Sequence, residues 1–150
     1  MEVYRIAKES FSKKLVASGL ANRWNKNDQH VIYTGSSRSL ATLELVVHRN
    51  NIMPAFAYRV MIISVADEEE LITTIQQKNL PENWRSIIAY PQLQQIGSDW
   101  CKSKQSLILK VPSAIISQEY NFVINTKHPD FLEKVTLVRT ENYFWDERLV

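Results

Sequence analysis

Residues 31–49 read VIYTGSSRSLATLELVVHR and contain the clearest strand–turn–helix pattern of the chain. The run VIY at 31–33 is β-branched and aromatic, which is typical of a strand. It stops at TGSS, residues 34–37, whose serines are candidate N-caps for the segment that follows. From Arg38 to Arg49, apolar residues recur at i, i+3 and i+7, which predicts an amphipathic helix with a stripe made of Leu40, Leu43 and Val47.

Glu44 lies on the apolar side of this predicted helix. Its neighbours at i−4 and i−3 are Leu40 and Ala41, so its carboxylate is expected on, or at the rim of, the buried face. An ionised acid in that setting is costly unless it is paired or hydrogen-bonded. The sequence leaves two interpretations open: an internal ion pair with an arginine, or a cavity in which a ligand uses the negative charge.

The rest of the chain mixes strand and helix patterns without strict βαβ alternation. We expect strands at 3–6, 55–65, 106–111, 120–124 and 134–145, and helices at 10–20, 67–77 and 91–101. This mixture favours an α+β fold over a doubly wound sheet. With 150 residues and no linker or repeat, the chain is expected to form a single compact domain, residues 1–150, with a mixed central sheet flanked by helices.

Composition argues against a disulfide-bonded protein, a zinc protein and a membrane-spanning protein. The chain is 45% hydrophobic and 23% charged, as is ordinary for a globular protein. A single cysteine, Cys101, excludes an internal disulfide, no Cys/His set has zinc-ligand spacing, and we expect no metal. No segment approaches the roughly 20 apolar residues that span a bilayer. Because the first residues also lack a basic region leading into an apolar run, we expect a cytoplasmic protein without membrane association.

Positive charge is concentrated in the first part of the chain. Residues 1–60 hold nine Lys and Arg against four acids. This surplus suits nucleic acid or a phosphate-bearing small molecule, and it also fits an ordinary surface. Arg23 lies in the run Arg23-Trp24-Asn25, and the forked guanidinium of an arginine is suited to bind a pyrophosphate. The alternative is a surface arginine beside a partly buried Trp. Arg5 interrupts an early strand and faces either a cleft or solvent.

Mixed with Trp24, these cations also resemble a weak platform for single-stranded nucleic acid, so a non-enzymatic nucleic-acid module is a further hypothesis. The net charge of only +2 and the lack of a nucleic-acid motif argue against it.

Two other candidate side chains end predicted strands, where sites are commonly built. Tyr33 either stacks on an aromatic ligand ring or is an ordinary aromatic at the edge of the core. Ser113 follows Val111-Pro112 but lacks the flanking glycines of a nucleophile elbow, and no histidine has a diagnostic spacing. A hydrogen-bonding Ser113 is therefore favoured over a nucleophile. No P-loop, dinucleotide fingerprint or zinc-protease motif is present.

Taken in chain order, these segments resemble the RES domain family, which is named for its Arg, Glu and Ser. The similarity covers nearly the whole chain, and one departure is the span 26–30, where the family usually has a glycine. The matching stretches are Tyr4-Arg5, Arg23-Trp24-Asn25, 31–34, 39–44 with His48, Ile96-Gly97 with Trp100, 111–114, Asn121, Asn125, His128-Pro129, and Asp146 with Arg148.

The resemblance implies the toxin of a bacterial type II toxin–antitoxin pair, with a core similar to ADP-ribosyltransferases. Such a toxin takes NAD as its substrate and cleaves the nicotinamide–ribose bond by hydrolysis or phosphorolysis, which depletes NAD and arrests growth. The alternative is a toxin that ADP-ribosylates a protein. The implied partner is an Xre-like helix-turn-helix antitoxin that covers the active cleft and makes the only contact with DNA. A toxin dimer within the hetero-oligomer is a further expectation.

Carried over position by position, the resemblance also assigns residue roles. Glu44 is then the acid beside the nicotinamide ribose, Tyr33 packs on the nicotinamide, and Arg5 and Arg23 bind the phosphates. Ser113 is a polar contact in the same pocket. The expected catalytic residues are therefore Glu44, Arg23 and Ser113, and the expected NAD-binding residues are Arg5, Arg23, Tyr33 and Ser113.

Overall fold

The computed structural model describes residues 1–50, 52 and 54–149, and within them the chain forms one seven-stranded sheet and three α-helices. The strands are β1 (Glu2–Lys8), β2 (Val31–Gly35), β3 (Tyr58–Val65), β4 (Ile72–Thr74), β5 (Ile108–Pro112), β6 (Tyr120–Asn125) and β7 (Val135–Asn142). The helices are α1 (Arg38–His48), α2 (Tyr90–Ser103) and α3 (Phe131–Lys134).

The sheet is mixed, as expected for an α+β domain. Its strand order is β4-β5-β6-β2-β1-β3-β7. Strands β4 and β5 pair in parallel, whereas the other neighbours pair antiparallel. The predicted fold class is therefore confirmed. The longest helix, α2, has 14 residues, and no helix among the described residues is long and apolar enough to cross a membrane.

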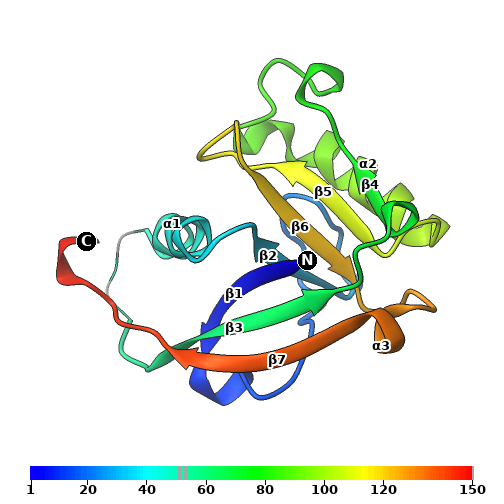
Figure 1. Cartoon of the computed structure of the whole chain (residues 1–150). Helices are drawn as coiled ribbons and strands as arrows, with labels where there is room; N and C mark the ends of the chain where they lie inside the picture. Colours follow the sequence, from blue (N-terminus) through cyan, green and yellow to red (C-terminus); the bar gives the residue numbers. More distant parts are fainter. Residues whose placement is uncertain (51, 53, 150) are drawn as a thin grey trace.

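The middle of the sheet is its weakest junction. Strands β1 and β2 are joined by one residue pair, Tyr4 with Gly35, whereas β1 and β3 pair over the whole of β1. The sheet therefore divides into a β1-β3-β7 half and a β2-β6-β5-β4 half, which diverge toward α1 (Figure 1).

Two apolar clusters hold these layers together. One lies where both halves of the sheet meet and includes Val3 and Met61 from one half and Ile108 and Ile124 from the other. The second lies between the β5-β6 part and α2, and its large side chains are Trp24, Trp84, Leu93, Trp100 and Val123. The second cluster explains why α2 covers this half of the sheet.

The segment 31–49 folds as its pattern predicts. The Ser37 hydroxyl accepts a hydrogen bond of 3.0 Å from the Leu40 amide and so caps α1. The predicted apolar stripe is only partly correct, because Leu40 is buried with Ala41 and Val46 while Val47 is 54% exposed. Periodicity identifies one side of a helix, but it does not say which turns a neighbouring layer covers.

Two predicted helices are wrong. Residues 10–20 contain only the end of a 3₁₀ turn at Glu9–Phe11 and then run without regular structure. Residues 67–77 contain the 3₁₀ turn Glu69–Leu71 followed by β4. The β-branched run Ile72-Thr73-Thr74 prefers a strand and finds its partner in β5, more than 30 residues later in the sequence.

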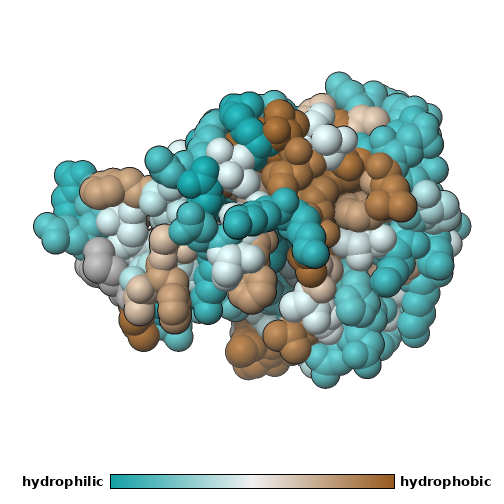
Figure 2. Space-filling model, turned by 90° about the horizontal axis from the view of Figure 1, so that it is seen from below, coloured by the Kyte–Doolittle hydropathy of each residue, from teal (hydrophilic) through white to brown (hydrophobic). Residues whose placement is uncertain are grey.

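The segment 10–20, which was predicted to be a helix, carries several apolar side chains that face solvent. Phe11, Val16 and Leu20 are exposed, as are Leu132 on α3 and Val138 on β7. Seen from below, apolar side chains gather on the right-hand part of that face (Figure 2). Leu15 and Ala17 of this segment pack partly buried against the core while Val16 between them is exposed, and this alternation suits an extended chain rather than one face of a helix.

Helix α2 touches the Arg23-Trp24-Asn25 segment at a glycine. A Cβ placed on Gly97 would lie 1.7 Å from the Trp24 carbonyl oxygen, which is a backbone atom and cannot rotate away. Gly97 therefore allows α2 to approach the Trp24 backbone closely.

We expect Gly97→Ala to destabilise the protein by about 1–3 kcal/mol or more, because the added methyl group forces the two backbones apart. Urea unfolding measures this loss. Gln92→Ala, at an exposed position of the same helix, is the matched control and should change the free energy of unfolding by less than about 0.5 kcal/mol. Equal stabilities of the Gly97→Ala protein and the control would contradict the close contact.

Candidate functional site

The carboxylate of Glu44 is fixed by two hydrogen bonds to the same oxygen. Oε1 accepts one of 2.9 Å from the Ser113 hydroxyl and one of 2.8 Å from the side-chain amide of Asn121. Helix α1 supplies the acid, while the serine and the asparagine lie at adjoining ends of β5 and β6. Of the two interpretations that the sequence left open, the internal ion pair is not found among the described residues.

The other oxygen of Glu44 has a different environment. No described residue donates a hydrogen bond to Oε2, and the side chain is only half-buried. Because both donors are used on Oε1, the plane of the carboxylate is set and Oε2 is the atom left for a ligand. The site thus holds an oriented acid with one oxygen available.

Ser113 is completely buried, and its hydrogen bonds leave it no freedom to rotate. Its hydroxyl oxygen accepts hydrogen bonds from the backbone amides of Ile115 at 3.1 Å and Ile116 at 3.2 Å. A hydroxyl has one hydrogen and two lone pairs, so the single hydrogen is directed to Glu44. In this structure the Ser113 hydroxyl is therefore a hydrogen-bond donor to the acid.

Asn121 is the site residue to which sequence reasoning assigned no role. It pairs with Gly35 of β2 and Val111 of β5, so it lies inside the sheet, where asparagine is uncommon. Its Oδ1 is buried and has no partner among the described residues. The available signal was an asparagine inside the predicted strand 120–124.

The sheet register brings Tyr33 to the same face as Asn121. Tyr33 pairs with Val123, and Asn121 lies two residues before Val123, so the two side chains are diagonal neighbours separated by roughly 7–8 Å. The Tyr33 hydroxyl donates a 2.6 Å hydrogen bond to Asn25 and accepts one of 3.0 Å from the Trp24 amide. Burial raises the pKa of the Tyr33 hydroxyl above its usual range, so it stays protonated.

Neither predicted phosphate-binding arginine has an acidic partner within 4.0 Å among the described residues. Arg23 donates hydrogen bonds of 3.0 and 3.3 Å to the carbonyl oxygens of Trp84 and Arg85, and its guanidinium lies 4.9 Å from the centre of the Tyr90 ring. A guanidinium without a counterion is suited to bind an anion.

Arg5 lies at the split between β1 and β2. Its Nη1 is 3.5 Å from the carbonyl oxygen of Tyr33. Val3 and Ala7, two residues away on either side in β1, belong to the core, so the guanidinium emerges from the core side, and burial lowers its pKa. The structure therefore joins Arg5 to Tyr33 and Glu44 to Ser113, and no hydrogen bond or ion pair between described residues joins Glu44 to either arginine.

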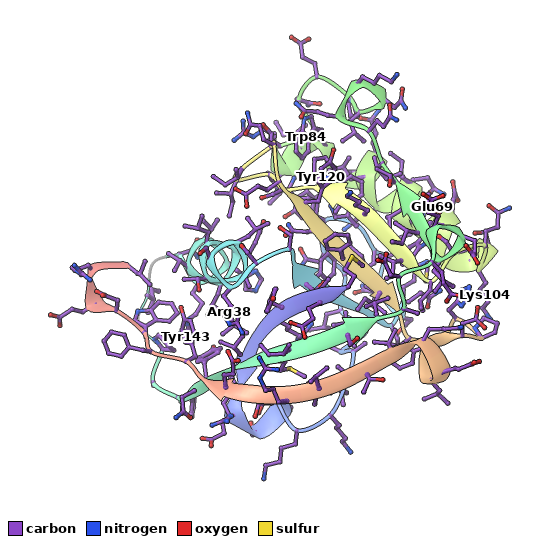
Figure 3. All side chains as sticks on the ribbon, viewed as in Figure 1. Arg38, Glu69, Trp84, Lys104, Tyr120 and Tyr143 are labelled. Atoms are coloured by element: carbon purple, nitrogen blue, oxygen red, sulfur yellow. The ribbon has the colours of Figure 1, made fainter. Side chains whose placement is uncertain are left out.

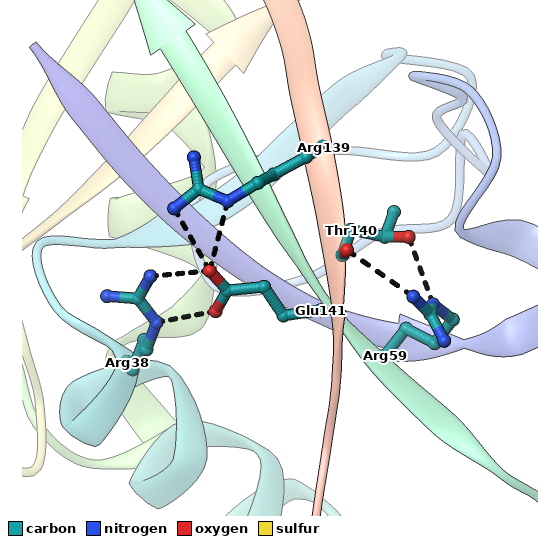
Figure 4. Close-up of polar contacts among 5 residues, drawn as sticks. All are labelled: Arg38, Arg59, Arg139, Thr140 and Glu141. Carbon is teal, nitrogen blue, oxygen red and sulfur yellow. Dashed lines mark hydrogen bonds and ion pairs between the residues drawn. The ribbon is translucent and has the colours of Figure 1, made fainter.

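The start of α1 is anchored to the far strand β7. Arg38 begins the helix (Figure 3) and donates two hydrogen bonds of 2.9 Å to Glu141 of β7, which also accepts hydrogen bonds from Arg139 (Figure 4). The hydrogen bonds from Arg38 hold the pKa of Glu141 below its usual value. The Arg38 guanidinium also lies 4.8 Å from the centre of the Tyr4 ring, so the helix that carries Glu44 has a defined position.

No cluster of three or more His, Cys, Asp or Glu side chains suited to a metal ion occurs in the part of the chain that the structure describes. The polar groups described at this site are the carboxylate of Glu44, the hydroxyl of Ser113 and the carboxamide of Asn121. Their arrangement can stabilise positive charge next to Oε2.

The family model described as "RES domain" matches residues 2–146. The chain belongs to the RES domain family. This confirms the family that the sequence segments suggested. The residue roles implied by that resemblance stay predictions.

Several curated proteins are similar to this RES domain along most of its length. A protein named "Toxin Res" from Yersinia enterocolitica is 33% identical over 133 residues, which cover 89% of this chain and 86% of that protein. The "Prs ADP-ribosylating toxin" of Sphingobium sp. (strain YBL2) is 35% identical over 130 residues, 85% of this chain and 80% of that protein. A "Toxin Res" from Photorhabdus laumondii is 31% identical over 130 residues, 85% and 81% of the two chains.

Tyr33→Phe should destabilise the RES domain by about 1–3 kcal/mol, because it leaves the buried Asn25 oxygen and the Trp24 amide without their partner. Chemical unfolding measures the change. Tyr143→Phe is the matched control, since the Tyr143 hydroxyl is buried without a partner among the described residues and its removal should cost much less. If both variants lose the same stability, the Tyr33 hydroxyl does not hold the segment.

Proposed function

We propose that this RES domain protein is the toxin of a bacterial toxin–antitoxin pair and cleaves the bond between nicotinamide and ribose in NAD. Family membership and the names of its relatives support a toxin. The observation that carries the chemistry is the Glu44 carboxylate, held through Oε1 by two donors with Oε2 left free of described partners.

Cleavage of a glycosidic bond develops positive charge on the sugar in an oxocarbenium-like transition state. A carboxylate fixed beside the reacting carbon stabilises that charge more in the transition state than in the ground state. In this proposal Glu44 directs Oε2 at the ribose, and Ser113 and Asn121 act as positioning residues. Their hydrogen bonds hold the acid before substrate arrives, so little reorganisation is needed during the reaction.

The other predicted residues have compatible roles. Arg5 and Arg23 lack acidic partners among the described residues and bind the diphosphate of NAD. Tyr33, whose hydroxyl is tied to Asn25 and Trp24, presents its ring to the nicotinamide in a fixed orientation. Water or inorganic phosphate accepts the ADP-ribosyl group, and the reaction requires no metal.

A second candidate function is transfer of ADP-ribose to a protein. The relative from Sphingobium, which is named as an ADP-ribosylating toxin, favours it. Both reactions begin with the same bond cleavage and use Glu44 alike, so they differ only in the acceptor. In either case we propose that the protein acts in the cytoplasm. Its proposed partner is an Xre-like antitoxin that covers the active cleft and is the component that contacts DNA. We also propose that the toxin dimerises within this complex.

Glu44→Gln should lower NAD cleavage by about 100-fold or more, because it removes the charge that stabilises the transition state while keeping the shape of the side chain. Purified protein is incubated with NAD, with and without inorganic phosphate, and the products are identified. Glu119→Gln, an exposed acid, is the matched control and should retain full activity.

The same two variants are expressed in cells without the antitoxin. The Glu119→Gln protein should arrest growth and lower NAD, whereas the Glu44→Gln protein should do neither. A folded Glu44→Gln protein that cleaves NAD at the original rate would overturn the role of Glu44. A modified cellular protein found by mass spectrometry, without net hydrolysis or phosphorolysis of NAD by the purified toxin, would select the second function.

Asn121→Ala should reduce kcat by about tenfold to 100-fold with little change in KM, because Asn121 acts on the substrate only through Glu44. Steady-state kinetics with NAD separate the two constants, and circular dichroism checks the fold. Ser117→Ala, in the turn between β5 and β6, is the control for a nearby loss of a polar side chain. An increase in KM alone would show that Asn121 contacts NAD directly.

A further inference from the structure

A second feature of the molecule lies away from Glu44. A surface hollow of about 470 Å³ opens between the loop before β2, the last turns of α2 and the turn after β6. Its described lining includes four lysines, which are Lys26, Lys102, Lys104 and Lys127. Lys104 lies at the right-hand edge of the view in Figure 3, away from Arg38, and Glu44, Ser113 and Asn121 are not among the described lining residues, so the hollow is separate from the Glu44 site.

The hollow carries an excess of positive charge. Asp28 is the one acid among its described lining residues, and none of the four lysines forms an ion pair with another described residue. Lys26 instead donates a 2.6 Å hydrogen bond to the uncharged Gln95. Ammonium groups gathered around one hollow repel each other, and a bound anion would relieve that repulsion.

The position of α2 accounts for only part of this cluster. Lys102 and Lys104 lie at the C-terminal end of the helix, where positive charge is favoured by the helix dipole. Lys26 and Lys127 come from two loops about 100 residues apart in the sequence, so the preference for basic residues within the last turn of a helix does not account for their placement. Their convergence on the same hollow needs a different explanation.

The walls of the hollow are fixed by polar contacts between the three segments. Gln29 accepts a 2.8 Å hydrogen bond from the Lys26 amide and donates one of 2.8 Å to Ser98 of α2. The fully buried Asn125 donates a 3.1 Å hydrogen bond to the carbonyl of Cys101 and accepts one of 3.0 Å from the Lys127 amide. A ligand would therefore meet a preformed surface and lose less entropy on binding.

We propose that this hollow binds a nucleoside phosphate. Lysine ammonium groups bind phosphate as point charges, and the volume falls within the range of about 300–1,000 Å³ that is usual for small-molecule sites. A bare phosphate would occupy only a small part of it. The lysine stems, Cys101 and His30 add less polar walls against which the base and sugar can pack.

A titration with ADP tests the proposal, followed by the backbone amide signals of the protein in NMR. ADP contains no nicotinamide, so the result does not depend on whether the protein cleaves NAD. We expect ADP to shift the signals of residues 26–30, 101–104 and 127, and to bind more weakly as salt rises. Adenosine, which lacks phosphate, should bind at least tenfold more weakly.

The double variant Lys102→Glu/Lys127→Glu should lose at least tenfold in affinity for ADP. Lys13→Glu/Lys14→Glu, which alters two exposed lysines outside the hollow, is the matched control and should bind as the unaltered protein does. Unchanged affinity of the first double variant, or shifts confined to the surroundings of Arg5, Tyr33 and Glu44, would overturn the proposal. Pyrophosphate binding as tightly as ADP would overturn the part that concerns the nucleoside.

Discussion

The candidate site depends on one constraint: two hydrogen-bond donors converge on a single oxygen of Glu44. Ser113 and Asn121 reach it from adjoining ends of the β5–β6 pair. The hydroxyl of Ser113 is itself held by two backbone amides, so the direction of its hydrogen follows from the loop that carries those amides. A half-buried acid on an apolar helix face is thereby tolerated without a cationic partner among the described residues, and its charge stays usable.

Much of the local structure around this acid follows from the sequence. The Ser37 cap, the strand before it and the helix after it are encoded within residues 31–49, and the unusual position of Glu44 on the same helix face as Leu40 and Ala41 marks it as a residue with a special environment. Asn121 could not be assigned in this way. Its role depends on a contact with Glu44, 77 residues earlier in the chain, and no local pattern encodes such a pairing.

The wrong helix predictions have the same physical origin. Residues 72–74 form a strand because β5 offers a partner in parallel register, and residues 10–20 pack Leu15 and Ala17 against the core in an alternation that no single helix face provides. The position of the Arg23-Trp24-Asn25 segment is likewise set from outside, by the Tyr33 hydroxyl below it and by Gly97 of α2 beside it. Local preference gave way to tertiary partners in both wrongly predicted helices.

The single residue pair between β1 and β2 has a consequence for the backbone itself. Beyond that pair the two strands separate, so peptide groups along the gap behave like those at the border of a sheet although they lie at its centre. One of them, the Tyr33 carbonyl, already accepts a hydrogen bond from a side chain, Arg5. The gap between β1 and β2 therefore leaves main-chain donors and acceptors that can bind other molecules. In a continuous ladder of strand pairs these groups would bond to each other.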